Sequence, residues 1–178
     1  QALAARGLAP VVGYEANGGF LTQTPIERDG RLLAALPTRD AVIVAVTVIG
    51  AARAAGLPVS ALSAGLPQRF TYSDRLQDFR SELSAQLLAQ FRTGDAEADR
   101  AALEAALGPE FGAIAQVDHT DGIRITLADG DVLHLRPSGN APELRAYTEA
   151  ATAADAEALN RRCLALLERW RRTAAAER

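Results

Sequence analysis

The sequence has no methionine and no lysine, and it has a single cysteine, Cys163. One cysteine excludes an internal disulfide and any zinc site built on paired thiols, which favours a reducing compartment such as the cytoplasm. All 19 basic residues are arginine, a bias that we attribute, with the high alanine content, to a GC-rich genome. From the absence of an initiator methionine, we expect a fragment whose N-terminal part is missing.

Other absences narrow the range of partners. No apolar run reaches the roughly 18–20 residues that a bilayer-spanning helix needs, and the start has no basic signal-peptide region. The net charge of −3 gives no sign of the basic surface that binds nucleic acid. The chain of 178 residues is 48% hydrophobic and 23% charged, which is typical of a globular protein with one ordinary domain or two small ones. We therefore expect neither a nucleic-acid nor a membrane partner.

The first part of the chain predicts short strands followed by one helix. Residues 2–8 predict the end of a helix, and Asp29-Gly30 predicts a hairpin turn. Residues 36–56 predict a helix with Thr38 as its N-cap and Gly56 as its C-terminal stop. This helix is apolar nearly all round, which predicts that it is buried. The order indicates part of an α/β layer.

Glycine and proline interrupt residues 56–79, which predicts a linker. Helices are then expected over 81–91, over 96–108 with Gly108-Pro109 as its end, and over 152–172. Between the last two lie four alternating segments, "AIAQVDHT", "GIRITLA", "VLHLRP" and "LRAYTEA", with Asp-Gly turns at 121–122 and 129–130. The predicted fold class is therefore α/β plus α+β: the end of an α/β domain, then an α+β domain with a four-stranded antiparallel sheet and flanking helices.

The loop "RPSGNAP", residues 136–142, has the chemistry of an anion cradle. Arg136 offers a planar fork that matches phosphate oxygens, and Ser138 adds a hydroxyl donor. Gly139 permits close backbone approach, and the prolines at 137 and 142 stiffen the loop. A surface loop without any ligand is equally consistent with this local chemistry.

The loop "GYEANGG", residues 13–19, places one carboxylate among small residues. Glu15 could accept hydrogen bonds from neighbouring sugar hydroxyls, and Asn17 could both donate and accept. Taken alone, an ordinary β-turn with a solvated glutamate is the simpler interpretation.

In this order the two loops resemble those of the α-D-phosphohexomutases, the phosphomannomutase/phosphoglucomutase family. "GYEANGG" resembles the sugar-specificity loop of that family, and "RPSGNAPELRAYTEA" resembles its C-terminal phosphate-binding loop and the strand that follows. "LPTRDAVIVAVTVI" and "LPQRFTYSDRL" lie between them in the expected order, so the resemblance covers nearly the whole chain. Asn140-Ala141 replaces the usual Thr-Glu, and Asn17 replaces a serine, which leaves the preferred hexose open.

The resemblance implies a domain division and a set of substrate contacts. Residues 1–65 would be the later part of domain three, and residues 66–178 would be domain four. Glu15 would bind sugar hydroxyls with help from Asn17. The phosphate would be held by Arg136, Ser138, Gly139 and Asn140, with Arg145 supporting the loop.

The resemblance also implies the chemistry of a longer parent enzyme. Such an enzyme interconverts hexose 6-phosphate and hexose 1-phosphate through a hexose 1,6-bisphosphate, using a phosphoserine and Mg²⁺. The N-terminal domains that hold the phosphoserine and the metal would be missing here, so this chain would carry no catalytic and no metal-binding residue and would be inactive alone. The alternative is a non-catalytic module that senses sugar phosphates.

Some residues only imitate functional motifs. "DAEADR", residues 95–100, resembles the family's metal loop but follows the sugar loop and opens a helix, where acids are favoured by the helix dipole. "ADGDV", residues 128–132, fits a hairpin turn better than a metal site. His119 and His134 lie among the predicted strands without an identified nucleophile, and His134 fits a strand surface or the rim of a site.

Overall fold

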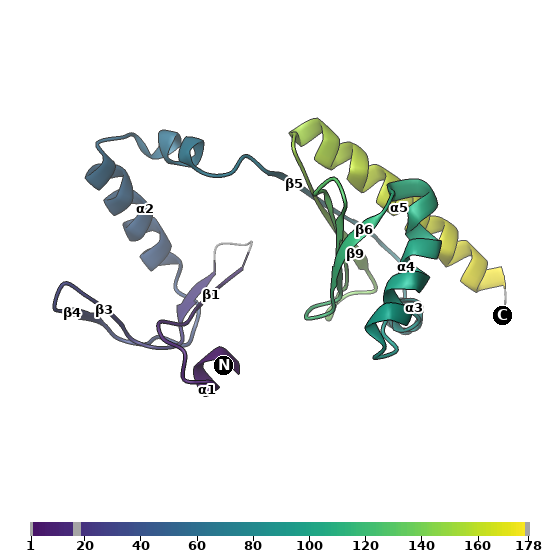
Figure 1. The fold of residues 1–178 in the computed structure, drawn as a ribbon, viewed down its shortest axis with the longest axis horizontal. Coiled ribbons are helices and arrows are strands. Elements are labelled where there is room, and N and C mark those ends of the chain that lie inside the picture. The colour runs from purple at the N-terminus through teal and green to yellow at the C-terminus, as the bar shows by residue number, and fades with distance from the viewer. Residues whose placement is uncertain (1, 16–18, 177–178) are drawn as a thin grey trace. The chain divides into compact units, whose positions relative to one another are not determined.

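A computed structural model describes residues 2–15 and 19–176 (Figure 1). The chain divides into two compact units, with the boundary between Pro67 and Gln68.

Short antiparallel hairpins make up most of the first unit. After α1 (Ala2–Ala5), β1 (Val12–Tyr14) pairs with β2 (Phe20–Thr22), and β3 (Ile26–Arg28) pairs with β4 (Arg31–Leu33). Asp29 and Gly30 join β3 to β4 with φ values of 52° and 68°. Positive φ at both positions is the geometry that an Asp-Gly turn favours, so the predicted hairpin is confirmed.

Helix α2 (Ala41–Ala55) begins later than the sequence indicates. Its N-cap is Asp40 and not Thr38, because the Asp40 carboxylate accepts hydrogen bonds from the backbone N–H groups of Val42 and Ile43 at 2.9 and 3.2 Å. The helix ends at Gly56 as expected, where φ is 65°. The 3₁₀ helix η1 (Val59–Gly65) follows.

The prediction that α2 is buried is wrong for the described unit. Ala52 is its only buried residue, while Val42 and Val46 are 70% and 62% exposed. The apolar composition of α2 favours burial. However, the helix contacts mainly η1 and β2. In the described part of the chain no single helix is long and apolar enough to cross a membrane. Only α2 and η1 together reach that length and composition, with an 80° bend between them.

The second unit contains a five-stranded antiparallel sheet in the order β5-β9-β8-β7-β6. Four strands match the predicted segments: β6 (Ile114–Asp118), β7 (Ile123–Leu127), β8 (Val132–Pro137) and β9 (Leu144–Ala150). The fifth, β5 (Phe70–Leu76), lies within the segment predicted to be a linker, so the expected number of four strands is corrected. Most of β5 is exposed and polar, and its strand conformation comes from pairing with β9, which local sequence does not encode.

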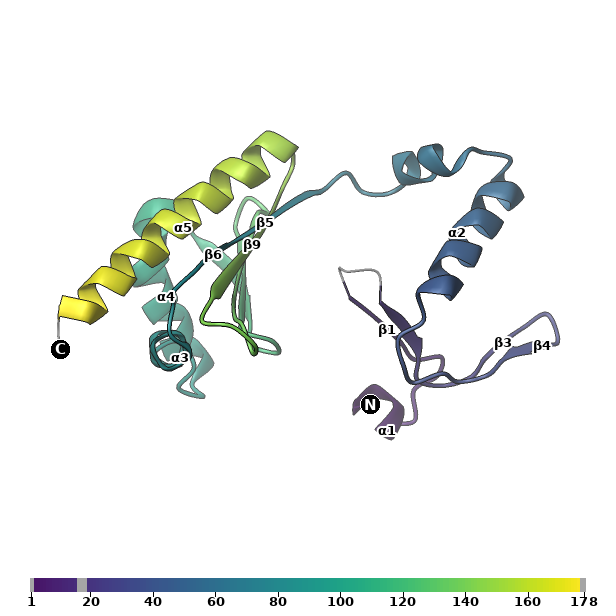
Figure 2. The ribbon, with the colours of Figure 1, turned by 180° about the vertical axis from the view of Figure 1, so that it is seen from behind.

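All three long helices of this unit lie on one face of the sheet. Figure 1 and Figure 2 show α3 (Ser81–Ala89), α4 (Ala96–Phe111) and α5 (Ala153–Ala176) on the same side. Helix α4 continues past the predicted stop at Gly108-Pro109 and ends before Gly112. The extra turn is held because Phe111 is buried in the core and lies 4.9 Å beneath the guanidinium of Arg162.

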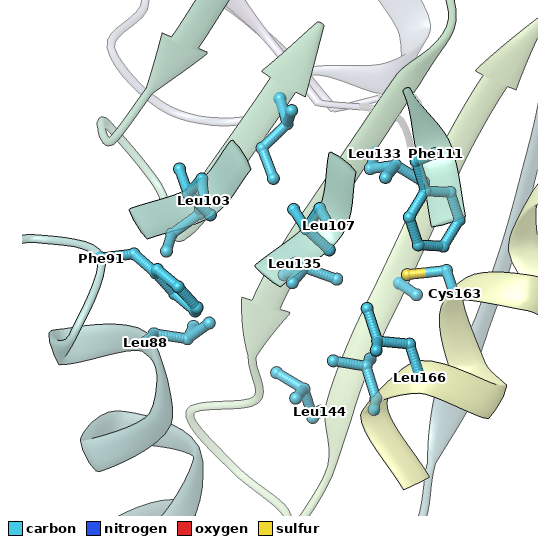
Figure 3. Close-up of a cluster of buried hydrophobic side chains, with 14 of the residues drawn as sticks. Leu88, Phe91, Leu103, Leu107, Phe111, Leu133, Leu135, Leu144, Cys163 and Leu166 are labelled. Carbon is cyan, nitrogen blue, oxygen red and sulfur yellow. The ribbon is translucent and has the colours of Figure 1, made fainter. Parts of the chain in front are cut away.

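The core fills the space between this sheet face and the helices. Figure 3 shows leucines of β8, β9 and α4 packed around Phe111 and Cys163. Along β9, Leu144 and Ala146 are fully buried, while the residues between them face the other side of the sheet. Burial raises the pKa of the Cys163 thiol to about 12, so this cysteine is a neutral core residue.

The turn at Gly122 tests this packing. A Cβ at Gly122 would overlap the carbonyl oxygen of Leu135, whereas a Cβ at Gly130 would meet nothing, and both glycines have positive φ. Gly130→Ala should therefore cost only the roughly 1–2 kcal/mol of an unfavourable backbone. Gly122→Ala should lower the free energy of unfolding by at least about 1 kcal/mol more, because the backbone of β8 must shift. Urea denaturation of both variants measures the difference, and equal values would contradict the close contact.

Candidate functional site

Three arginines form one row across neighbouring strands. Arg136 of β8 pairs directly with Arg145 of β9, and Arg145 pairs with Arg75 of β5. Directly paired residues face the same side of a sheet. Because the neighbours of Arg145 in β9 are buried under the helices, the arginine row lies on the opposite, uncovered face. Like charges directly opposite one another are destabilising, so this row requires anions beside it.

Two carboxylates lie against the row. Asp121, in the turn between β6 and β7, contacts Nε of Arg136 with its Oδ2 at 2.8 Å. Glu143 contacts Arg75 at 3.1 Å and Arg145 at 3.7 Å. The hydrogen bond to Asp121 is the main influence that raises the pKa of the Arg136 guanidinium above its ordinary value, and this group therefore stays charged at any physiological pH.

The loop between β8 and β9 closes on itself beside this row. The Ser138 N–H donates to the carbonyl of Glu143 at 2.9 Å. The Ser138 hydroxyl, in a residue only 7% exposed, accepts from Nη2 of Arg145 and from the Asn140 N–H, both at 3.4 Å. Both bonds use the hydroxyl as an acceptor, which leaves its proton for donation to an anion. The second unit thus brings Arg136, Ser138, Asn140 and Arg145 together at one end of the sheet.

Within the part of the chain that the structure describes, nothing requires residue 139 to be glycine. It is absent from the glycines with positive φ, and a Cβ built on it would meet nothing within 4 Å. Backbone conformation and packing therefore do not explain this residue. A requirement for close approach by a ligand would explain it.

Glu15 belongs to the first unit and has a different partner. Its N–H donates to the carbonyl of Gly19 at 2.8 Å, which closes the loop after β1. Its carboxylate accepts from Nη2 of Arg39 at 2.8 Å, with the Glu15 side chain 46% exposed. Asn17, predicted to assist Glu15, lies outside the described residues. The ion pair gives Glu15 a defined orientation that the turn alone would not.

Sequence reasoning missed Asp121, Arg75 and Glu143 as members of the site. The sequence indicates only a hairpin turn at Asp121. The predicted strand order nevertheless holds a signal for its place in the site, because every second connection of an antiparallel meander lies at the same end of the sheet. The turn between β6 and β7 and the loop between β8 and β9 are two such connections. Arg75 had no comparable signal, because its strand was not predicted.

The acidic motif at residues 95–100 has a structural role. Asp95 is the N-cap of α4 and accepts from the N–H groups of Glu97 and Ala98. Asp99 is 4% exposed, and its carboxylate accepts from both the N–H and the hydroxyl of Thr93 at 2.7 Å. Across residues 2–15 and 19–176, no three His, Cys, Asp or Glu side chains are grouped so that they could hold a metal ion.

The other residues that imitated a site also have local partners. The Asp129 carboxylate accepts from the N–H of Asp131 within the turn between β7 and β8. His134 lies on the uncovered sheet face, where its ring contacts Tyr147 with 5.5 Å between centroids. His119 Nε2 lies 4.0 Å from the Asp99 carboxylate. These contacts account for Asp129 and His134, whereas Nδ1 of His119 is buried without a hydrogen-bond partner among the described residues.

Asp99 should stabilise the fold in a pH-dependent way. The hydrogen bond from the Thr93 backbone, followed by that from its hydroxyl, lowers the pKa of the Asp99 carboxyl. A lowered folded-state pKa gives stability that is present above the unfolded value of about 3.9 and is lost as pH falls through the folded value. Asp99→Asn should lower the melting temperature at pH 7 by a few degrees, with the difference from wild type shrinking below about pH 4. Glu97→Gln, an exposed acid in the same helical turn, is the control for thermal melts, and a pH-independent difference would contradict this account.

Comparisons with known proteins identify relatives of this chain. Residues 88–165 match the family model described as the phosphoglucomutase/phosphomannomutase C-terminal domain. The chain is 42% identical over 146 residues to a phosphomannomutase of Salmonella muenchen, covering 82% of this chain and 29% of that protein. It is 37% identical over 163 residues to a phosphomannomutase of Sinorhizobium fredii, covering 92% of this chain and 33% of that protein. The chain thus spans about a third of the length of these curated relatives.

A solved structure shares the fold. The crystal structure of a phosphoglucomutase/phosphomannomutase family protein from Burkholderia thailandensis superposes with a TM-score of 0.59 at 20% identity, covering 96% of this chain and 30% of that one. At this identity the likeness shows the fold alone. The sequence matches establish that the chain belongs to the phosphohexomutase family and corresponds to the C-terminal part of its members.

Proposed function

We propose that this chain is the C-terminal part of a cytoplasmic phosphomannomutase/phosphoglucomutase and binds the non-reacting end of a hexose phosphate. Arg136, Ser138, Gly139 and Asn140 bind the phosphate, and Arg145 supports their loop. Glu15 binds sugar hydroxyls, with Asn17 as its proposed helper. The reaction served is the interconversion of hexose 6-phosphate and hexose 1-phosphate through a hexose 1,6-bisphosphate.

The observation that carries this proposal is the arginine row beside a loop with a buried serine. Arg136 and Arg145 are paired across two strands, and the Ser138 hydroxyl lies between the loop backbone and Arg145. A phosphate oxyanion is the ligand that matches clustered guanidinium forks and a hydroxyl donor. Gly139 adds a position where neither packing nor conformation calls for glycine, which suits the approach of an anion to the backbone.

In this proposal the chain contributes positioning. Phosphoryl transfer is catalysed mainly by holding the reacting groups in place and by stabilising charge. The phosphoserine and the Mg²⁺ would be held by N-terminal domains of the parent enzyme, where the metal would neutralise charge on the transferred phosphoryl group. The residues of this chain would fix the opposite phosphate and the sugar hydroxyls, so that the bisphosphate can present either end to the reacting groups.

Arg136→Ala should weaken phosphate binding strongly. Loss of a charge-assisted interaction costs roughly 1.5–3 kcal/mol, which is about 10- to 150-fold in affinity. Isothermal titration calorimetry of the 178-residue chain with glucose 1-phosphate, mannose 1-phosphate and inorganic phosphate measures this. Arg124→Ala is the matched control, because Arg124 pairs with His134 on the same sheet face but contacts Thr126. Equal affinities for the wild type and Arg136→Ala would exclude the phosphate-binding role.

The chain alone should have no mutase turnover. It is proposed to hold substrate and to lack the groups that transfer phosphate, so binding and catalysis should separate. A coupled assay with the purified chain, Mg²⁺ and glucose 1,6-bisphosphate tests this. Turnover that copurifies with the chain and disappears in Arg136→Ala would show that the reacting groups are present and would contradict the proposal.

A further inference from the structure

The turn between β6 and β7 is fixed against the strand that leads into the phosphate loop. Ile123 pairs with Leu135, and Gly122 lies so close to the Leu135 carbonyl that no Cβ fits between them. Nε2 of His134 lies 2.6 Å from the carbonyl oxygen of Asp121. That oxygen can only accept, so Nε2 is the donor. These contacts hold the backbone of Asp121 in place.

From this fixed turn the Asp121 carboxylate lies 2.8 Å from Nε of Arg136. A guanidinium carries five N–H donors in a rigid planar fork, one on Nε and two on each Nη. A carboxylate on Nε fixes the plane of the fork. The Tyr147 side chain also hydrogen-bonds to this guanidinium, and the Nη N–H groups that neither partner uses remain for another anion. Paired Nη donors match two oxygens of one phosphate.

This ion pair contributes little to holding the fold together. The Arg136 and Asp121 side chains are 42% and 62% exposed, and ion pairs with that exposure add little to stability. The backbone contacts of the turn do not depend on the carboxylate, because they involve the carbonyl of Asp121 and the glycine that follows it. Aspartate suits the Asp-Gly turn, but the turn does not require the carboxylate to lie against Arg136.

We propose that Asp121 is a positioning residue for phosphate recognition: it binds Nε of Arg136 and thereby directs the remaining Nη N–H groups toward the phosphate. The inference rests on the proposed role of Arg136 in phosphate binding. The inference predicts the direction in which phosphate affinity changes when the Asp121 carboxylate is removed. Removing a negative charge beside an anion site should by simple electrostatics tighten phosphate binding. If Asp121 orients the fork, removing it should weaken binding instead.

The test compares two changes at residue 121 with inorganic phosphate and glucose 1-phosphate as calorimetric probes of the 178-residue chain. Asp121→Ala removes both the charge and the acceptor, and should weaken binding by about two- to tenfold. Asp121→Asn removes the charge but keeps an oxygen that accepts from Nε and a residue that suits the turn. It should bind phosphate at least as tightly as the wild type.

Asp129→Ala is the matched control. It changes the aspartate of the other Asp-Gly turn, which joins β7 to β8 at the opposite end of the sheet. It should leave phosphate affinity unchanged. Thermal melts of all variants identify any loss of folding. If Asp121→Ala does not fold, Asp121→Ser, which keeps a turn-forming residue without a carboxylate, takes its place under the same expectation.

A double-mutant cycle separates orientation from general structural damage. In the Arg136→Ala background, Asp121→Ala should cause no further loss of affinity, because the group that it orients is gone. A loss of the same size in both backgrounds, or binding by Asp121→Ala as tight as that of the wild type, would overturn the inference. If Arg136→Ala itself leaves affinity unchanged, the proposed function fails first. If only Asp121→Ala is without effect, the positioning role alone fails.

Discussion

The register of the sheet sets Arg136, Arg145 and Arg75 side by side on three adjacent strands. Three guanidinium groups in one row repel one another, and the carboxylates of Asp121 and Glu143 offset part of this repulsion. The arrangement concentrates positive charge at one end of an otherwise acidic chain. This concentration of charge favours the binding of an anion. Phosphate oxygens can accept hydrogen bonds from the same guanidinium groups that the two carboxylates contact.

The two faces of the sheet divide the work between stability and recognition. Residues such as Leu135 and Leu144 bury against the helices and fix the strands (Figure 3). Arg136 and Arg145 follow these leucines in the chain and lie on the other face, so the packing of the leucines also fixes the distance between the two arginines. A binding group attached to a well-packed strand is held more firmly than one on a free loop, which matters in a reaction whose catalysis depends on positioning. Only Ser138, Gly139 and Asn140 belong to the loop itself.

Local sequence signals were sufficient to predict the hairpins and four of the strands of the sheet. The Asp-Gly dipeptides predicted the hairpins, and alternating apolar residues predicted four strands. The sequence could not reveal β5, because its polar residues adopt a strand only by pairing with β9 across the chain. The end of α4 was wrong because burial of Phe111 outweighs the helix-breaking effect of Pro109. For the site, the phosphate loop was visible as a motif, but Asp121 could be found only from sheet topology.

The pairing of strand β5 also determines which hydrogen bonds would break first under force on the connection between the two units. The chain passes from the unit boundary after Pro67 almost directly into an edge strand whose first pair is Phe70 with Ala150. Its last pair, Leu76 with Leu144, lies beside the phosphate loop. Tension arriving through the connection would therefore unzip hydrogen bonds from the Phe70 end. Arg75 pairs with Arg145 next to the last pair of this edge, so separation that starts at Phe70 would reach the arginine row only near its end.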